Sequence, residues 1–250
     1  MAIQMVEYKF ESIYLFVDII YQAVKSEVEF WNFDADEFIQ SATTFQRKSL
    51  LHIYVESTLF NCFSRDFRKN GDCYEEDNVD EWKSIFSSYN VKLNFPNCNF
   101  DDSEENECAY EWFLDNERSF RALFKKISIE VVHILFANKK FLLQFNELAR
   151  KSFNLIPDAL LTEKETVKRT AIPQWVKKAV FYRDYGRCVF CNKDLTGVFS
   201  TLATSNYDHI IPLDKQGFNN ICNIQLSCEN CNKSKGVKEE SPIYKYEPRW

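Results

Sequence analysis

Two pairs of cysteines constrain this 250-residue chain more than any other feature of its sequence. Cys188 and Cys191 form one Cys-x-x-Cys motif, and Cys228 and Cys231 form a second one after 36 intervening residues. Two thiolates at this spacing can hold one side of a tetrahedral zinc ion, and a second pair completes the ligand set. A redox pair is disfavoured because there are two motifs and neither lies in a βαβ pattern. We therefore predict that these four cysteines bind one structural Zn²⁺.

Other features of the sequence indicate the cellular compartment of the protein. The most apolar early stretch, residues 13–23, contains Asp18 and falls short of the ~20 apolar residues that a membrane span needs. No basic segment followed by a small-residue cleavage site begins the sequence. We therefore expect a cytoplasmic protein without a membrane span, where thiols stay reduced. Nine cysteines then indicate metal ligands and buried thiols rather than disulfides.

Charge and phenylalanine content divide the chain into two parts. Residues 1–165 hold 18 Lys and Arg against 29 Asp and Glu, whereas residues 166–250 hold 13 against 8. Only four of the 23 Phe residues lie in the second part. Such asymmetry indicates two roles. We expect an acidic, Phe-rich domain over 1–165, a basic domain over 166–250, and a polar linker at 161–170.

Helical periodicity dominates the first part. Apolar residues recur at helical spacing over 3–24, 45–67 and 109–153, and Asp34 or Asp36 can cap a helix that follows it. Residues 91–107 look least ordered, and a short helix is expected over 79–89. These patterns predict a bundle of helices whose aromatic residues form its core, with no chemistry of its own.

Polar residues converge between and beside the two cysteine motifs. Residues 207–213 (YDHIIPL) and 224–226 (IQL) predict two short strands, and residues 229–238 predict a basic helix. Asp208 and the amide of Asn232 offer the oxygen ligands that Mg²⁺ or Mn²⁺ prefers. His209 is the only histidine of this part and the candidate general base. Asn223 is a candidate for orienting its ring, through its side chain or its backbone carbonyl.

These residues resemble a known family. The segments IPQWVKKAVFYRDYGRCVFC, YDHIIPL, CNIQLSC and CENCNKSKG, within about residues 172–237, look like a four-cysteine HNH endonuclease domain. The resemblance implies a ββα-metal fold, with His209 as base, Asp208 and Asn232 as ligands of a catalytic divalent ion, and Asn223 as the middle Asn. Asn232 stands where many members have His, which makes this an H-N-N variant. Asn219 and Asn220 compete with Asn223 for the middle position, and Cys222 is read as a core residue.

The complete fold prediction is therefore α+β, a helical N-terminal bundle followed by a small zinc-stabilised ββα-metal domain. Its surface is expected to neutralise phosphates through seven basic residues: Lys177, Lys178, Arg183, Arg187, Lys233, Lys235 and Lys238. The predicted activity is hydrolysis of DNA, with RNA left open and a bacterial or phage defence role suggested by the resemblance.

Two other functions stay open at this stage. One is a zinc-knuckle module that binds nucleic acid without cutting it, and the other is a nuclease subunit active only within a larger complex. The acidic first domain would repel a polyanion, so we expect it to dimerise or to bind a protein partner.

Overall fold

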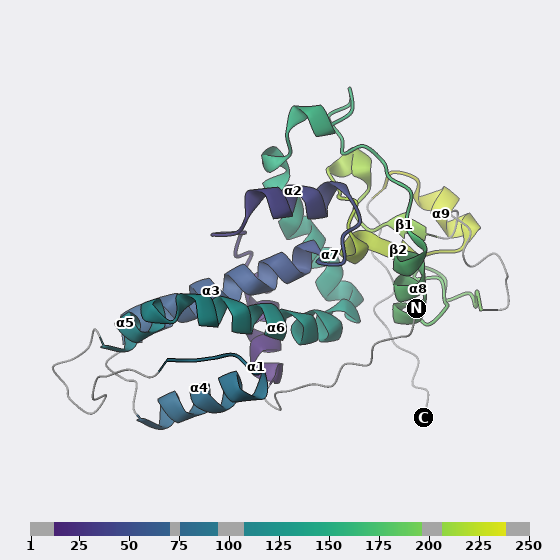
Figure 1. Ribbon diagram of the computed structural model, residues 1–250. Helices are drawn as coiled ribbons and strands as arrows, with labels where there is room; N and C mark the ends of the chain where they lie inside the picture. Colours follow the sequence, from purple (N-terminus) through teal and green to yellow (C-terminus); the bar gives the residue numbers. More distant parts are fainter. Residues whose placement is uncertain (1–12, 71–75, 95–107, 197–206, 239–250) are drawn as a thin grey trace.

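The computed structural model describes residues 13–70, 76–94, 108–196 and 207–238, and the first part of the chain is helical, as predicted (Figure 1). Its α-helices are α1 (Ile13–Lys25), α2 (Ala35–Thr43), α3 (Leu50–Asn70), α4 (Glu76–Ser88), α5 (Cys108–Asp115), α6 (Glu117–Phe136) and α7 (Lys139–Ala149). Helices α3 and α6 lie against each other along the middle of this body, and α1 packs on α6.

Side-chain caps explain several helix boundaries. Of the two candidate caps that the sequence offers, Asp34 accepts a hydrogen bond from the Glu37 backbone N–H (2.9 Å) and caps α2, whereas Asp36 lies in its first turn. The helical period over 109–153, by contrast, covers three helices. Asn138 caps α7 through the Phe141 N–H (3.0 Å), and Asn116 stands between α5 and α6 with its side chain bonded to the backbone of Asn94. Periodicity alone does not reveal these breaks because the apolar face continues across them.

Aromatic rings form the core of the helical part. Phe67, Phe113 and Phe120 pack with centroid separations of 4.6 to 5.7 Å, and Trp82 of α4 meets Phe120 edge-on at 5.1 Å. Rings in such offset or perpendicular pairs add to the free energy gained by burial. The aromatic stripes in this part of the sequence therefore serve packing, as expected.

A small sheet and two helices make up the second part. They are α8 (Gln174–Arg183), β1 (Tyr207–His209), β2 (Ile224–Leu226) and α9 (Glu229–Lys235), with short 3₁₀ turns at Leu213–Lys215 and Ile221–Asn223. The strands pair antiparallel, with His209 opposite Ile224. These elements gather at one end of the helical body, beside α2 and α7 (Figure 1). The predicted fold class, a mostly helical chain with a small ββα unit near its end, is confirmed.

Packing continues across the predicted domain boundary. Ile210, Phe218 and Cys222 belong to the same buried cluster as the helical core. Phe218 stacks on Phe153 (centroids 5.8 Å) and meets Phe38 edge-on (6.0 Å). The loop that joins the two strands is thus inserted into the helical part.

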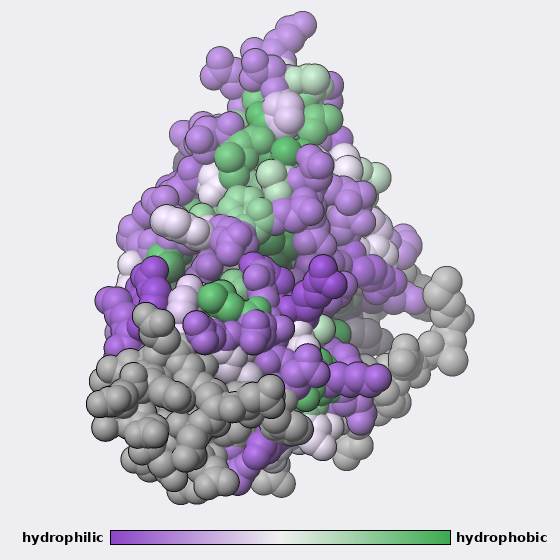
Figure 2. Space-filling view, turned by 60° about the vertical axis from the view of Figure 1, so that its left-hand side comes forward, coloured by the Kyte–Doolittle hydropathy of each residue, from purple (hydrophilic) through white to green (hydrophobic). Residues whose placement is uncertain are grey.

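The segment predicted as a linker is also ordered. Leu161 and Val167 form an antiparallel bridge, and Val167 is 1% exposed. Figure 2 shows one face of the molecule, which is largely hydrophilic, with hydrophobic patches between the hydrophilic residues. No helix in the described ranges is both long and apolar enough to cross a membrane.

Candidate zinc centre and nuclease site

The four cysteines of the two motifs come together at the end of the sheet. Their Sγ atoms all lie within 4.8 Å of one another, and Cys191 Sγ is 3.7 Å from Cys228 Sγ. Four sulfurs at the Zn–S bond length form a tetrahedron with edges of ~3.8 Å, so the cluster fits one zinc ion. Cys222 lies apart, fully buried against Ser49 Oγ (3.7 Å), and is a core residue as expected.

Among the four thiols, Cys228 has a lowered pKa. Burial raises the pKa of Cys228, but hydrogen bonds from the Cys231 backbone and from neighbouring thiols outweigh it and bring the pKa to about 7. Burial raises the pKa of Cys188 and of Cys231, which hold protons more tightly. Bound zinc would displace these protons, since thiolates are its ligands.

Strand β1 contacts α9 through the Asp208 side chain and the His209 backbone carbonyl. Lys235 of α9 is completely buried, and its Nζ lies 2.7 Å from Asp208 Oδ2 and donates to the backbone carbonyl of His209 (2.9 Å). Gln225 of β2 donates to the same carboxylate (3.4 Å). Burial of the ammonium is tolerated because a carboxylate and a carbonyl both face it. Lys235 therefore ties α9 to β1 at the site.

Asn232 lies on the side of α9 that faces β1. It lies three residues before Lys235 on α9, and residues at this spacing share one side of a helix. Because Lys235 contacts Asp208, that side of α9 faces β1. A carboxylate oxygen and an amide oxygen are both donors of the kind that suits Mg²⁺ or Mn²⁺.

His209 lies deeper than a solvent-facing base would. It is 2% exposed, and burial lowers its pKa to about 3, with the charges of Arg169 and Lys235 acting in the same direction. Hydrogen bonding from Asn219 opposes this effect and raises the pKa. The imidazole is therefore neutral at physiological pH, the form that can accept a proton.

Asn223 organises the loop between the strands. Its side chain accepts from the Ile211 N–H (2.8 Å) and donates to the carbonyls of Ile211 and Phe218 (both 3.0 Å). Its own carbonyl accepts from the Ile210 N–H (2.7 Å). These bonds fix the backbone that follows His209. The predicted contact between Asn223 and the ring of His209 is not among the hydrogen bonds of the described residues.

Asn219 and Asn220 bind the helical part instead. Asn219 donates from its backbone to Ala42 O (2.9 Å) and from its side chain to Thr43 O (3.0 Å). Asn220 donates to Ser41 O (3.0 Å). Both residues thereby satisfy carbonyls at the last turn of α2, which have no partner within the helix.

The seven basic residues predicted to contact phosphate divide by burial. Arg183 forms a buried ion pair with Asp184 (2.8 Å) and donates to Ile224 O, Lys177 is buried beside Tyr207, and Lys235 lies inside the site. These three support the domain from within. Lys178, Lys233 and Lys238 are exposed, and Arg187 is half-buried, with an ion pair to Asp194 at 4.0 Å.

Comparison with known proteins agrees with this geometry. Residues 188–238 match the family model described as HNH endonuclease. This part of the chain is therefore an HNH endonuclease domain, and it carries a four-cysteine cluster that fits zinc. No curated protein and no solved structure matches the chain.

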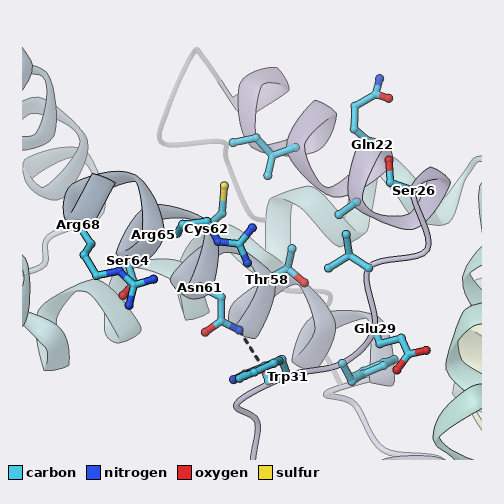
Figure 3. Close-up of a pocket in the computed structure, with 14 residues that line it drawn as sticks. Gln22, Ser26, Glu29, Trp31, Thr58, Asn61, Cys62, Ser64, Arg65 and Arg68 are labelled. Atoms are coloured by element: carbon cyan, nitrogen blue, oxygen red, sulfur yellow. Dashed lines mark hydrogen bonds between the residues drawn. The ribbon is translucent and has the colours of Figure 1, made fainter. Parts of the chain in front are cut away.

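A separate cavity lies in the helical part, between α1 and α3 (Figure 3). It has a volume of about 700 Å³, and Trp31 forms one wall, where its backbone carbonyl accepts from Asn61 (3.1 Å). Arg65 and Arg68 reach its other side from α3. None of the predicted site residues lines it, so it is distinct from the HNH site.

Sequence reasoning missed two residues of the site, one beside His209 and one beside Asn219. Arg169 places its charge near the ring, and Lys168 offers its carbonyl to Asn219 (2.8 Å). Both belong to the segment interpreted as a linker and lie outside the HNH match. No pattern in the sequence marks them, because their role depends on where the chain crosses the site.

Proposed function

We propose that this chain is a metal-dependent endonuclease that hydrolyses phosphodiester bonds of DNA. The observation that carries the proposal is the contact of Lys235 with the Asp208 carboxylate and the His209 carbonyl, which places these two neighbours on β1 beside the helix that carries Asn232, within an HNH domain. HNH domains are usually nucleases, and the local excess of basic charge suits a polyanionic substrate.

The roles follow from the chemistry of each side chain. Asp208 and Asn232 would hold a Mg²⁺ or Mn²⁺ ion, which when bound stabilises negative charge on the phosphate and on the departing oxygen. His209, neutral in the folded protein, would take the proton of the attacking water. Its depressed pKa rises when phosphate charge enters beside the ring, because a nearby anion favours the imidazolium.

Four of the predicted basic residues suit phosphate contact. Lys178, Arg187, Lys233 and Lys238 keep solvent access, so we propose that they contact the DNA backbone without reading its sequence. Replacing an exposed lysine of this group by alanine should weaken binding equally for all sequences. The slope of log K against log salt should fall in magnitude by about one per lost phosphate contact.

A plasmid-nicking assay on the full chain tests the activity. With Mg²⁺ or Mn²⁺ present, His209→Ala should lower the cleavage rate by roughly 10²–10⁴-fold, as expected for a lost general base. His133→Ala is the matched control, since His133 is exposed on α6. Equal cleavage by His209→Ala and the wild type would contradict the assignment.

The same assay separates the other readings. A module that only binds nucleic acid would retain DNA in a shift assay and cut nothing with any divalent ion. A nuclease that works only within a complex would begin to cut when its partner is added. Parallel reactions with single-stranded DNA, duplex DNA and RNA decide the substrate class.

The biological setting is part of the proposal. A role as an effector in bacterial or phage defence is what the resemblance suggests, and a cytoplasmic location suits a site that needs four reduced thiols. For the helical part we propose contact with a protein partner or a second copy, supported by exposed Trp31 (75%) and Val28 (47%) beside the cavity of Figure 3. Light scattering of the wild type and of Trp31→Ala tests for a second copy.

A further inference from the structure

Two buried polar atoms near the proposed base lack partners. His209 Nε2 and Asn219 Oδ1 are both inaccessible to water, and neither has a hydrogen-bond partner among the described residues. Burying such atoms without partners costs free energy, so each of them calls for an explanation. The Asn219 amide also lies close enough to the ring to raise the imidazole pKa by hydrogen bonding.

The orientation of the Asn219 amide is unambiguous. Its Nδ2 donates to two carbonyls, Thr43 O (3.0 Å) and Lys168 O (2.8 Å). A carbonyl can only accept, so the NH₂ end of the amide must face these two atoms and Oδ1 must point away from them. Asn219 itself is completely buried, and its backbone N–H is held by Ala42 O. The amide therefore has no freedom to turn.

We infer that Asn219 is a positioning residue for His209: its Oδ1, aimed by carbonyls from α2 and from the connecting segment, accepts from Nε2–H of the imidazole. This bond fixes the neutral ring as the Nε2–H tautomer and leaves Nδ1 with the lone pair that accepts a proton. The bond would satisfy both buried atoms at once. The role of His209 as base rests on the proposed function.

This assignment gives the helical part a place in the nuclease site. Thr43 ends α2, and its carbonyl lies 176 residues away in sequence from the amide that it aims. The helical part then acts on the base through Asn219, besides supporting the fold. Asn223, by comparison, holds the backbone beside His209.

Nitrogen-15 NMR of the full zinc-loaded chain, labelled at histidine, tests the inference without substrate or catalytic metal. The chain has three histidines, and a His209→Gln spectrum identifies the signal of interest. We expect His209 as the Nε2–H tautomer at pH 7.5. His52 serves as an internal reference, because its Nδ1 accepts from the Ser49 N–H (3.1 Å) and it must therefore also be Nε2–H. A wild-type His209 signal of the Nδ1–H tautomer would overturn the inference, whatever the variants do.

The matched variants are Asn219→Ala and Asn220→Ala. Both residues are buried, and both donate to carbonyls of α2, but the side chain of Asn220 satisfies Ser41 O and the Cys222 N–H instead of acting on the ring. Asn219→Ala should shift His209 towards a tautomer mixture and lower kcat about 10- to 100-fold with little change in KM. Asn220→Ala should keep the tautomer.

The outcomes separate this inference from the proposed function. An unchanged tautomer in Asn219→Ala, or the same change in Asn220→Ala, would reject the positioning role. A chain that cuts no nucleic acid but shows the expected tautomers would reject the nuclease proposal and retain the contact. If Asn219→Ala does not fold, the wild-type tautomer still decides.

Discussion

At the scale of single residues, the proposed ligands and the proposed base should separate in metal dependence. Asp208→Asn and Asn232→Ala should raise the Mn²⁺ concentration needed for half-maximal cleavage by at least about 10-fold, because the first removes the negative charge of a ligand and the second removes an oxygen donor. His209→Ala should leave that concentration unchanged while lowering the maximal rate. Cleavage titrated against Mn²⁺ for the three variants is the measurement. Unaltered Mn²⁺ dependence in both ligand variants would contradict the assignment of Asp208 and Asn232.

His52, far from any proposed chemistry, gives a pH-dependent contribution to stability. Burial and then the charge of Lys48 lower its pKa to about 4, whereas the unfolded chain has the ordinary value near 6.5. The unfolded state therefore binds more protons than the folded state between these two pH values. The contribution of His52 to the free energy of unfolding is at its maximum above pH 6.5 and decreases as the pH drops towards 4.

The loss of stability between pH 7.5 and pH 5 should be smaller in His52→Gln than in the wild type by about 1–2 kcal/mol. Urea unfolding midpoints of wild type and variant at pH 7.5, 6 and 5 measure it, with exposed His133→Gln as the control. A wild type and a His52→Gln variant that lose stability in parallel would contradict the prediction.

At the scale of elements, the zinc cluster joins the turn after α8 to the start of α9. Cys191→Ser or Cys228→Ser should abolish the single bound zinc and unfold this region, since structural zinc supplies folding free energy directly. Elemental analysis together with circular dichroism checks both effects. Cys62→Ser, at an exposed position of α3, should retain one zinc per chain. Folded, active wild-type protein that contains no zinc would rule out the centre.

Local patterns allowed part of this architecture to be predicted. The cysteine spacing, the Asp34 cap and the strand at 224–226 depend on residues close in sequence, and each appears in the structure where it was expected. Arg183 is a different case. Its sequence position on a basic helix indicated phosphate contact, but Asp184 and the carbonyl of Ile224 hold it inside the fold. The contact between Arg183 and Ile224 joins residues 41 positions apart, and neither local composition nor hydrophobic periodicity predicts such a contact.

At the scale of the whole molecule, the sequence suggested two separable domains, and the packing argues for joint folding. The predicted boundary at 165/166 rests on charge and Phe content, which describe surfaces and local composition. Charge and Phe content do not reveal that Phe218 of the basic part packs in the helical core, between Phe38 and Phe153. Asn146 of α7 likewise donates to the carbonyl of Cys222 (2.8 Å).

Cutting the chain at this boundary should therefore damage both pieces. Residues 166–250 alone would expose Ile210, Phe218 and Cys222 to water and leave Asn219 without its α2 partners. Residues 1–165 alone would lose the cover of the same core. A buried Phe truncated to Ala costs about 3–5 kcal/mol, so Phe218→Ala in the full chain should lower the free energy of unfolding by a similar amount.

Expression of the two pieces, separately and together, followed by thermal or urea unfolding, tests whether either piece folds alone. We expect each piece alone to aggregate or to show a broad, uncooperative unfolding transition, and the co-expressed pieces to purify as one complex with the wild-type zinc content. Phe190→Ala in the full chain is the control for ring loss at a half-buried position outside the junction, and it should destabilise less than Phe218→Ala. Independent, cooperative unfolding of residues 166–250 with wild-type DNA cleavage would contradict joint folding. It would also show that His209 needs nothing from α2, because the Thr43 carbonyl would then be missing from an active site.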